Sequence, residues 1–113
     1  MIKTAEFVTP GHPDKRCDFI ADSILDAYLA GDPSSRVATE VMGGHNLVTV
    51  NGEVTSKAKP DIIALVKSIV GEEYKVIQNI VLQSPQIARG VDTGGAGDQG
   101  IMKGYATNET ESL

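Results

Sequence analysis

The chain has 113 residues, 41% of them hydrophobic, and a formal net charge of −5. This length suits one domain with a single two-layer core. The negative charge excludes a nonspecific binder of nucleic acid or of an anionic membrane, because both need a basic surface. The single cysteine, Cys17, cannot form an internal disulfide and indicates a reducing compartment. We expect no leader and no membrane-spanning run, and therefore a cytoplasmic protein.

The first third of the chain predicts a strand and then a helix. Lys3–Val8 tolerates strand structure, and the helix runs from Pro13, which suits a first helical position, to Gly31, a natural residue to end it. Its apolar residues recur at the spacing of one buried face; they are Cys17, Ile20, Ala21, Ile24, Leu25 and Tyr28. Three aspartates fall on the opposite side, Asp18, Asp22 and Asp26.

Strands are predicted next at Arg36–Met42, Leu47–Val50 and Glu53–Thr55, where β-branched residues are frequent. Two places compete for the reversal of the chain. Asn51-Gly52 is a strong hairpin signal, or alternatively a bulge inside one long strand. We expect the reversal at Gly43-Gly44 instead.

The second half predicts one more helix and one more strand. Pro60 and Asp61 open the helix, which ends at Gly71. Its apolar stripe is Ile62, Leu65, Val66, Ile69 and Val70. Val76–Leu82 is a largely apolar strand, expected at the centre of the sheet. The fold class is therefore α+β: a two-layer β-α-β-β-α-β domain over residues 1–113, with two helices on one face of the sheet.

From Gln83 to Gly104 no periodicity holds, and six of the twelve glycines lie between Gly90 and Gly104. A loop of this length in a compact domain is usually functional, so a gate over a site is expected here. After Tyr105 the chain is polar and ends without a terminating element, which predicts a continuation beyond Leu113.

Gly11-His12-Pro13-Asp14-Lys15 places three reactive side chains where a helix begins. A helix amino terminus offers unpaired N–H groups to a phosphate oxygen, to which His12 can donate and which Lys15 can neutralise. Asp14 beside a phosphate is repulsive unless a cation lies between them, and Mg²⁺ favours that arrangement. From spacing alone, the alternative is a proline-started helix with an acid in its first turn.

Gly95–Gly100 matches the pattern G-x-G-x-x-G. The dinucleotide-binding form of this pattern follows a strand and opens a helix, and this one does neither, which argues against a dinucleotide-dependent oxidoreductase. The loop either offers accessible N–H groups beside Asp98 and Gln99 or is an ordinary surface loop.

Two strand carboxylates and one amide are further candidates. A carboxylate that faces the covered side of a sheet needs a compensating cation, so Glu40 and Glu53 can each hold a cation or an amine. Each of them can equally face solvent from an edge strand. Gln83 follows the last strand, where binding groups are common, or belongs to the turn that ends it.

Five boxes in a fixed order carry a resemblance to one family. They are Gly11–Asp18, Arg36–Glu40, Gly52–Thr55, Gln83–Val91 and Gly95–Thr110. From about Glu6 to the end, the chain resembles the amino-terminal domain of S-adenosylmethionine synthetase (methionine adenosyltransferase). The resemblance implies three such domains in a homodimer or homotetramer, with active sites between subunits. The alternative is a stand-alone noncatalytic module that binds a ligand or another subunit.

The resemblance also implies a reaction, in which ATP and L-methionine form S-adenosylmethionine with release of phosphate and pyrophosphate. Mg²⁺ and K⁺ are the cofactors that it implies. His12 would be catalytic and would bind ATP together with Lys15 and Asp98, while Asp14 would hold Mg²⁺ and Glu40 would serve the K⁺ site. The isolated chain is expected to be inactive, because cationic residues of the other two domains are absent.

For methionine, the resemblance implies contacts from Glu53 and Gln83. It places a flexible gate at Gln83, Ser84, Pro85, Gln86, Ile87, Ala88, Arg89, Gly90, Val91, Asp92 and Thr93. The chain departs from the family pattern at four places: Pro10 replaces an acid, Phe19 replaces a polar residue, and the connections Gly71–Val76 and Gly90–Gly95 are short.

Overall fold

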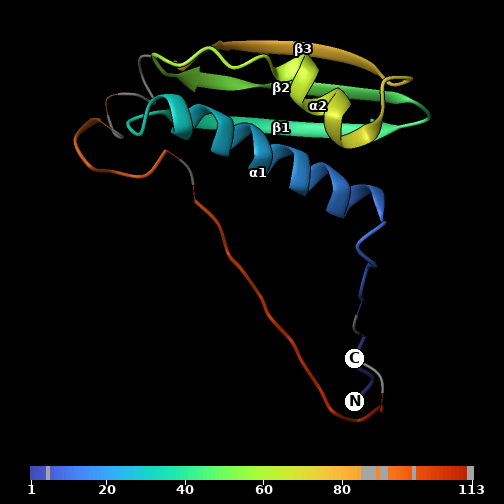
Figure 1. Ribbon diagram of the computed structural model, residues 1–113. Helices are drawn as coiled ribbons and strands as arrows, with labels where there is room; N and C mark the ends of the chain where they lie inside the picture. The colour runs from blue at the N-terminus through green and yellow to red at the C-terminus, as the bar shows by residue number, and fades with distance from the viewer. Residues whose placement is uncertain (5, 85–88, 90–91, 98, 112–113) are drawn as a thin grey trace.

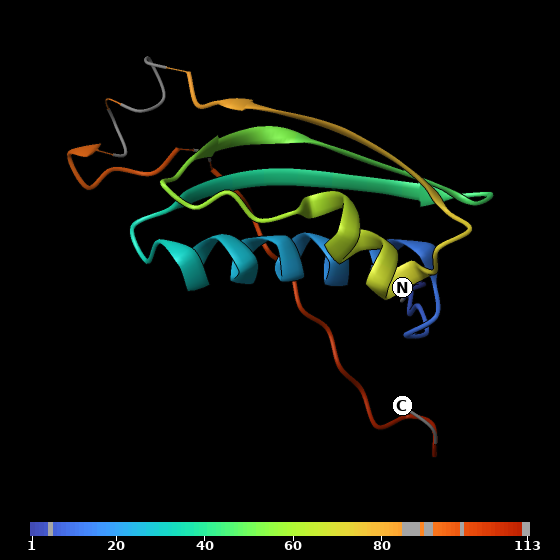
Figure 2. The ribbon, with the colours of Figure 1, turned by 45° about the horizontal axis from the view of Figure 1, so that its top comes forward.

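A computed structural model describes residues 1–4, 6–84, 89, 92–97 and 99–111. Its elements in chain order are α1 (Pro13–Gly31), β1 (Arg36–Gly44), β2 (Leu47–Thr55), α2 (Ile62–Val70) and β3 (Lys75–Leu82). They form one three-stranded sheet in the order β1-β2-β3, with both helices on the same face (Figures 1 and 2). The predicted two-layer α+β class is confirmed.

Both predicted helices form where the sequence places them. His12 caps the amino end of α1, Pro13 occupies its first turn, and Asp61 caps α2 by accepting a hydrogen bond from the Ala64 N–H at 3.0 Å. Their apolar stripes pack on the sheet around one aliphatic core. The fully buried members of that core are Ile20, Ile24, Val48, Val50, Ile62 and Val66.

The chain reverses two residues later than expected. Gly43 and Gly44 complete β1, and the turn is made by His45 and Asn46, whose φ angles are 50° and 60°. Positive φ at both central residues is typical of a type I′ hairpin turn, which matches the twist of the two strands. Gly43-Gly44 therefore marks the end of a strand and not the turn itself.

Asn51-Gly52 lies inside β2, which is one unbroken strand from Leu47 to Thr55. Its residues pair one-to-one with β1, so this strand pair has neither a turn nor a bulge there. A Cβ at position 52 would collide with the Ala38 carbonyl and with Cα of Thr39. Glycine at this position permits the close approach of two strands, a use that its sequence signal does not distinguish from a turn.

Two strand predictions are wrong. The described residues of Lys3–Val8 form no strand, since strand propensity needs a neighbouring ladder to pair with and none is present for them. β3 lies at an edge of the sheet, and β2 is central. The apolar composition of β3 therefore does not come from a central position in the sheet. Val76 and Ile80 pack on the helix-side core, whereas Ile77 and Val81 lie on the opposite, uncovered face.

No helix among the described residues is long and apolar enough to cross a membrane.

On the uncovered face of the sheet, the side chains form rows that run across the strands. In register, Glu40, Asn51 and Asn79 form a polar middle row, and the Asn79 side-chain amide donates to the Asn51 Oδ1 at 3.1 Å. Exposed apolar residues lie on both sides of this row, namely Met42, Leu47, Ile77 and Val81. Exposed apolar residues of this kind, here divided by the polar row, commonly mark an interface.

Asp32 ties two loops together at the far end of α1. Its carboxylate accepts hydrogen bonds from the Lys57 N–H at 2.9 Å and the Ser34 N–H at 3.0 Å. These two bonds, with Lys57 the larger contributor, hold the pKa of Asp32 below its ordinary value of 3.8. The loop after α1 is thereby linked to the loop after β2.

Because the pKa of Asp32 is lower in the folded protein than in the unfolded chain, its ionised form stabilises the fold above pH 3.8, and this stabilisation is lost as the pH falls through the folded-state pKa. We expect Asp32→Asn to lower the midpoint of thermal unfolding at neutral pH. The difference in midpoint between wild type and this variant should become smaller below pH 3.8. Asp26→Asn is the control, since Asp26 is exposed on α1. Equal midpoints for wild type and Asp32→Asn at pH 7 would contradict this role.

Candidate functional site

The amino end of α1 fixes the tautomer of His12. The Asp14 N–H donates to Nδ1 of His12 at 3.1 Å, so the ring closes the first turn of the helix as its cap. A neutral imidazole that accepts at Nδ1 carries its proton on Nε2. His12 therefore presents one N–H donor away from the helix, beside the positive end of the helix dipole.

The Asp14 side chain is 84% exposed, and its Oδ2 lies 3.9 Å from Nδ1 of His12. Asp18 lies one turn further along α1 and lines the same shallow pocket, between α1 and the end of β1. Among the described residues no group of three or more His, Cys, Asp or Glu side chains is close enough to hold a metal. Mg²⁺ needs fewer protein ligands, because one or two carboxylates suffice when waters and phosphate oxygens complete its shell. The donor set therefore fits Mg²⁺ bound together with a phosphate.

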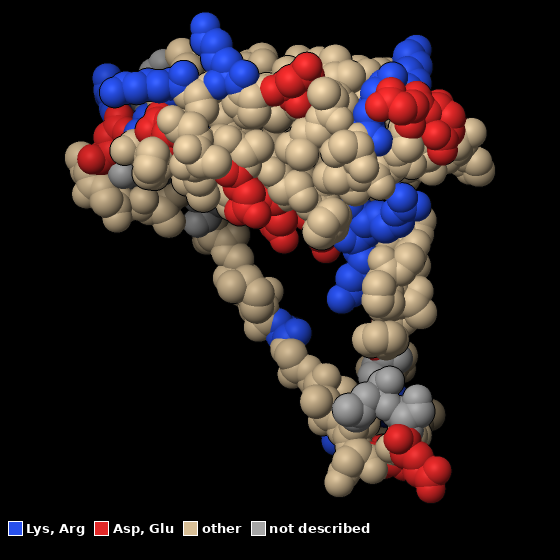
Figure 3. All heavy atoms as spheres, viewed as in Figure 1, with Lys and Arg blue, Asp and Glu red and all other residues tan. Residues whose placement is uncertain are grey.

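Lys15 is exposed in the same first turn. Basic side chains gather where the amino-terminal segment meets α1 (Figure 3). The chain has a net charge of −5, but its local charge at this helix end includes cations suited to an anion.

Glu40 is exposed on β1, an edge strand, in the polar row of the uncovered face. Its cross-strand neighbour is Asn51, whose amide oxygen is oriented by Asn79. Carboxylate and amide oxygens are suitable ligands for a hard cation, so Glu40 and Asn51 offer two side chains of that type. Taken by itself, the position is also an ordinary one for a solvated acid.

Glu53 and Gln83 come together at the other end of the sheet. The Glu53 Oε2 accepts from the Ser84 N–H at 3.4 Å, and Gln83 is the first residue after β3. The parallel pairing of β2 with β3 places these two strand ends side by side. An acid and an amide at the paired ends of β2 and β3 thus form a second polar site.

Arg36 organises this second site, a role that the sequence analysis did not assign to it. Its Nε donates to Oε1 of Gln83 at 3.0 Å, and its Nη1 pairs with Oδ1 of Asp92 at 2.7 Å. Since arginine can only donate, the Gln83 amide must turn its oxygen toward Arg36 and leave its NH₂ group available. Arg36 is the first residue of the motif Arg36–Glu40. Its partners Gln83 and Asp92 lie 47 and 56 residues further along the chain, so the spacing within the motif does not predict these contacts.

Several predicted gate and nucleotide residues lie outside the described residues. These are Pro85, Gln86, Ile87, Ala88, Gly90, Val91 and Asp98. In the described part of the gate, the Thr93 hydroxyl donates to the Arg89 carbonyl at 3.1 Å. Asp92, also in this part, forms the ion pair with Arg36.

The two halves of the candidate site lie at opposite ends of the domain. α1 runs antiparallel to β1, so His12 and Asp14 lie beside the hairpin end, while Glu53, Gln83 and Arg36 lie at the end where β1 begins (Figure 1). From Gly43, beside Asp14, to Ala38, opposite Glu53, is about 17 Å at about 3.3 Å per strand residue. In one copy of the chain, the described residues of the two halves therefore lie at opposite ends of the sheet.

Comparison with known proteins decides the family. The family profile described as S-adenosylmethionine synthetase, N-terminal domain, matches residues 1–89. This chain belongs to the S-adenosylmethionine synthetase family. It is 46% identical over 135 residues to S-adenosylmethionine synthase of Parasynechococcus marenigrum, covering 97% of this chain and 32% of that protein. It is 45% identical over 137 residues to S-adenosylmethionine synthase 1 of Frankia casuarinae, covering 97% and 34%.

A solved structure supports the same family. The unusual S-adenosylmethionine synthetase from Campylobacter jejuni superposes with a TM-score of 0.62 and 35% identity, over 68% of this chain and 25% of that one. The chain thus spans about a third of the length of the curated synthases that it matches. The alignment with the Parasynechococcus protein has 135 positions but covers 97% of this chain, or about 110 residues. About 25 aligned positions are therefore gaps in this chain. Among the described elements, only Gly71–Tyr74 separates α2 from β3.

Proposed function

We propose that this chain is the first of three domains of a methionine adenosyltransferase, which forms S-adenosylmethionine from ATP and L-methionine and releases phosphate and pyrophosphate. The observation that carries the proposal is the pair of polar sites on one family scaffold: a phosphate-type site at the start of α1, and an acid and amide site at the ends of β2 and β3. A cytoplasmic location fits the lone Cys17.

The chemistry needs charge compensation more than it needs a base. The thioether sulfur of methionine is already a nucleophile and requires only positioning against C5′ of the ribose. The triphosphate leaving group gains charge as the C5′–O bond breaks. The Nε2–H of His12, the Lys15 ammonium and the end of the α1 dipole would stabilise this charge as fixed donors. Asp98 would contact the nucleoside.

Asp14, with Asp18 beside it, would hold Mg²⁺ against the triphosphate, and Glu40 would serve K⁺. Magnesium, when bound, supplies further charge neutralisation to the phosphate oxygens. Without it, the carboxylate of Asp14 would repel the same oxygens that His12 and Lys15 attract.

Methionine would be held by its two charged ends. The Glu53 carboxylate would pair with the ammonium group, and the NH₂ of Gln83, turned outward by Arg36, would donate to the carboxylate group. The Arg36–Asp92 ion pair would keep the described end of the gate next to this subsite.

The active site would form between two subunits. In a two-fold pair of sheets packed through their uncovered faces, an axis that runs across the strands would bring opposite ends of the two copies together. The phosphate half of one subunit would then lie beside the methionine half of its partner. The apolar residues Met42, Leu47, Ile77 and Val81 would supply the buried surface of that homodimer or homotetramer.

A chimera tests the proposal. This chain replaces the corresponding third of the Parasynechococcus synthase, and S-adenosylmethionine formation is measured with ATP, methionine, Mg²⁺ and K⁺. We expect turnover from the chimera, loss of turnover on His12→Asn, and none from the 113-residue chain alone. A folded, oligomeric chimera that binds neither substrate would favour the alternative of a noncatalytic module, and turnover by the isolated chain would refute its dependence on other domains.

A further inference from the structure

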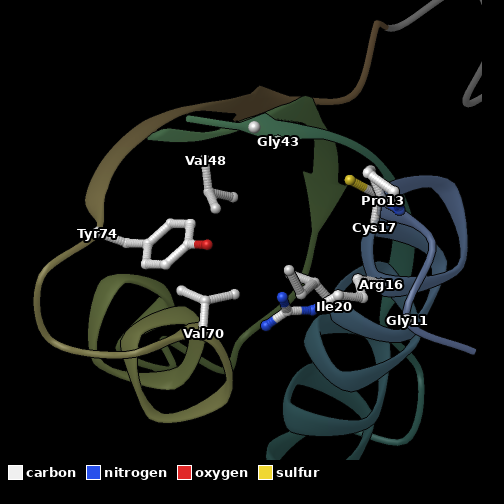
Figure 4. A pocket seen from close by; sticks show the side chains of 10 residues that line it. Gly11, Pro13, Arg16, Cys17, Ile20, Gly43, Val48, Val70 and Tyr74 are labelled. Atoms are coloured by element: carbon white, nitrogen blue, oxygen red, sulfur yellow. The ribbon is translucent and has the colours of Figure 1, made fainter. Parts of the chain in front are cut away.

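A second pocket lies behind the start of α1 and shares Pro13, Cys17 and Gly43 with the pocket that Asp14 and Asp18 line. Its volume is about 90 Å³, and it is formed where the first turn of α1 meets the hairpin end of the sheet and the end of α2 (Figure 4). A space of this volume holds more than one water, so it admits a ligand of a few non-hydrogen atoms. His12, Asp14 and Lys15 are not among the residues that line it.

The wall of this pocket is apolar except for two donors. Ile20, Val48 and Val70 supply aliphatic surface, and Cys17 adds its thiol. The Arg16 guanidinium and the Tyr74 hydroxyl point into the hollow from opposite sides (Figure 4).

Neither donor is used within the described structure. In the described part of the chain, the side chains of Arg16 and Tyr74 form no hydrogen bond or ion pair. No acidic residue lines the pocket, although the protein is acidic overall. The lining therefore offers the positive charge of Arg16, which has no acidic partner in the pocket, and the neutral hydroxyl of Tyr74. Both lie near the positive end of the α1 dipole.

We propose that this pocket binds a small organic carboxylate. The carboxylate meets the planar guanidinium of Arg16 and the hydroxyl of Tyr74, in the charge-assisted geometry that arginine favours. A short carbon chain rests on Ile20, Val48 and Val70. Inorganic phosphate fits less well, because it has no apolar part to cover these three side chains.

Cys17 reports on this occupancy because its thiol lines the same pocket. Iodoacetate and iodoacetamide alkylate a thiol by the same step: sulfur attacks the methylene carbon, the S–C bond forms, iodide leaves, and the thiol proton passes to solvent. Only iodoacetate carries the carboxylate. The ratio of the two rate constants at Cys17, measured by peptide mass spectrometry, therefore isolates carboxylate recognition from thiol reactivity.

We expect this ratio to be about tenfold higher in the folded protein than in urea, where no pocket exists. Propionate should protect Cys17, and propionamide should not. Arg16→Gln should return the ratio to within about twofold of the unfolded value, and Tyr74→Phe should lower it in part. Lys15→Gln is the matched control, since it removes a neighbouring positive charge that does not line the pocket.

A ratio that is the same in folded and unfolded protein overturns the proposal. So does an elevated ratio that Lys15→Gln lowers as much as Arg16→Gln does, because the effect is then one of general charge. The measurement follows alkylation and not turnover, so its outcome is independent of the proposed enzymatic function.

Discussion

In a full-length synthase that carries this domain, we expect Asp14→Asn to lower turnover by about 100-fold or more. Loss of one group that stabilises transition-state charge has an effect on this scale. The amide that replaces the carboxylate keeps its size and its place in the first turn of α1. It loses the negative charge that, in the proposed function, draws Mg²⁺ toward the triphosphate. The Mg²⁺ concentration for half-maximal activity therefore rises together with the loss of turnover.

The measurement is a magnesium titration of turnover at saturating ATP and methionine. Asp22→Asn is the matched control, because Asp22 is exposed on the same helix but lines neither pocket at its start. It should leave both turnover and the titration unchanged. A loss of turnover in Asp14→Asn with an unaltered magnesium midpoint would remove Asp14 from the metal site.

The helices and the core were predictable because their signals are local. The apolar positions of Pro13–Gly31 and of Ile62–Val70 follow a single 3.6-residue period, and capping residues mark both starts. Glycine is less informative in strands. Gly44 ends β1 just before the turn, whereas Gly52 permits the close approach of β1 and β2. The sequence shows a glycine in both cases and does not distinguish the two roles.

The arrangement of strands could not be predicted, because it depends on long-range pairing. Val76–Leu82 has the apolar composition of a central strand, yet lies at an edge with one face on the helices and the other uncovered. Lys3–Val8 has the composition of a strand but no partner among the described residues. The composition of a strand indicates how much of its surface is apolar, but it does not indicate which strands pair with it.

The candidate site was predicted as a set of residues, but not as a geometry. His12, Asp14, Glu53 and Gln83 were each identified from motifs in a fixed order. Their separation into two ends of one domain follows only from the antiparallel course of α1 and β1. Arg36 was missed because its two partners come from distant segments that only the fold brings to it.

This separation makes a strong prediction about subunits. Glu53→Gln removes the charge that we propose pairs with the methionine ammonium, and it keeps an acceptor for the Ser84 N–H. It should therefore abolish most turnover at limiting methionine without unfolding the end of the sheet. Asp14→Asn damages the other half of the site. If each site takes one half from each subunit, a mixed dimer of the two variants contains one site with both defects and one intact site.

Co-expression of Asp14→Asn and Glu53→Gln subunits in equal amounts is the most direct test of a site shared between two copies. Half of the randomly assembled dimers are mixed, and each has one intact site, so the preparation should recover about a quarter of wild-type turnover. Co-expression of Asp14→Asn with His12→Asn, two defects in the same half, should recover none. Turnover of the first mixture no higher than the mean of its two parent variants would contradict the shared site and place both halves in one chain.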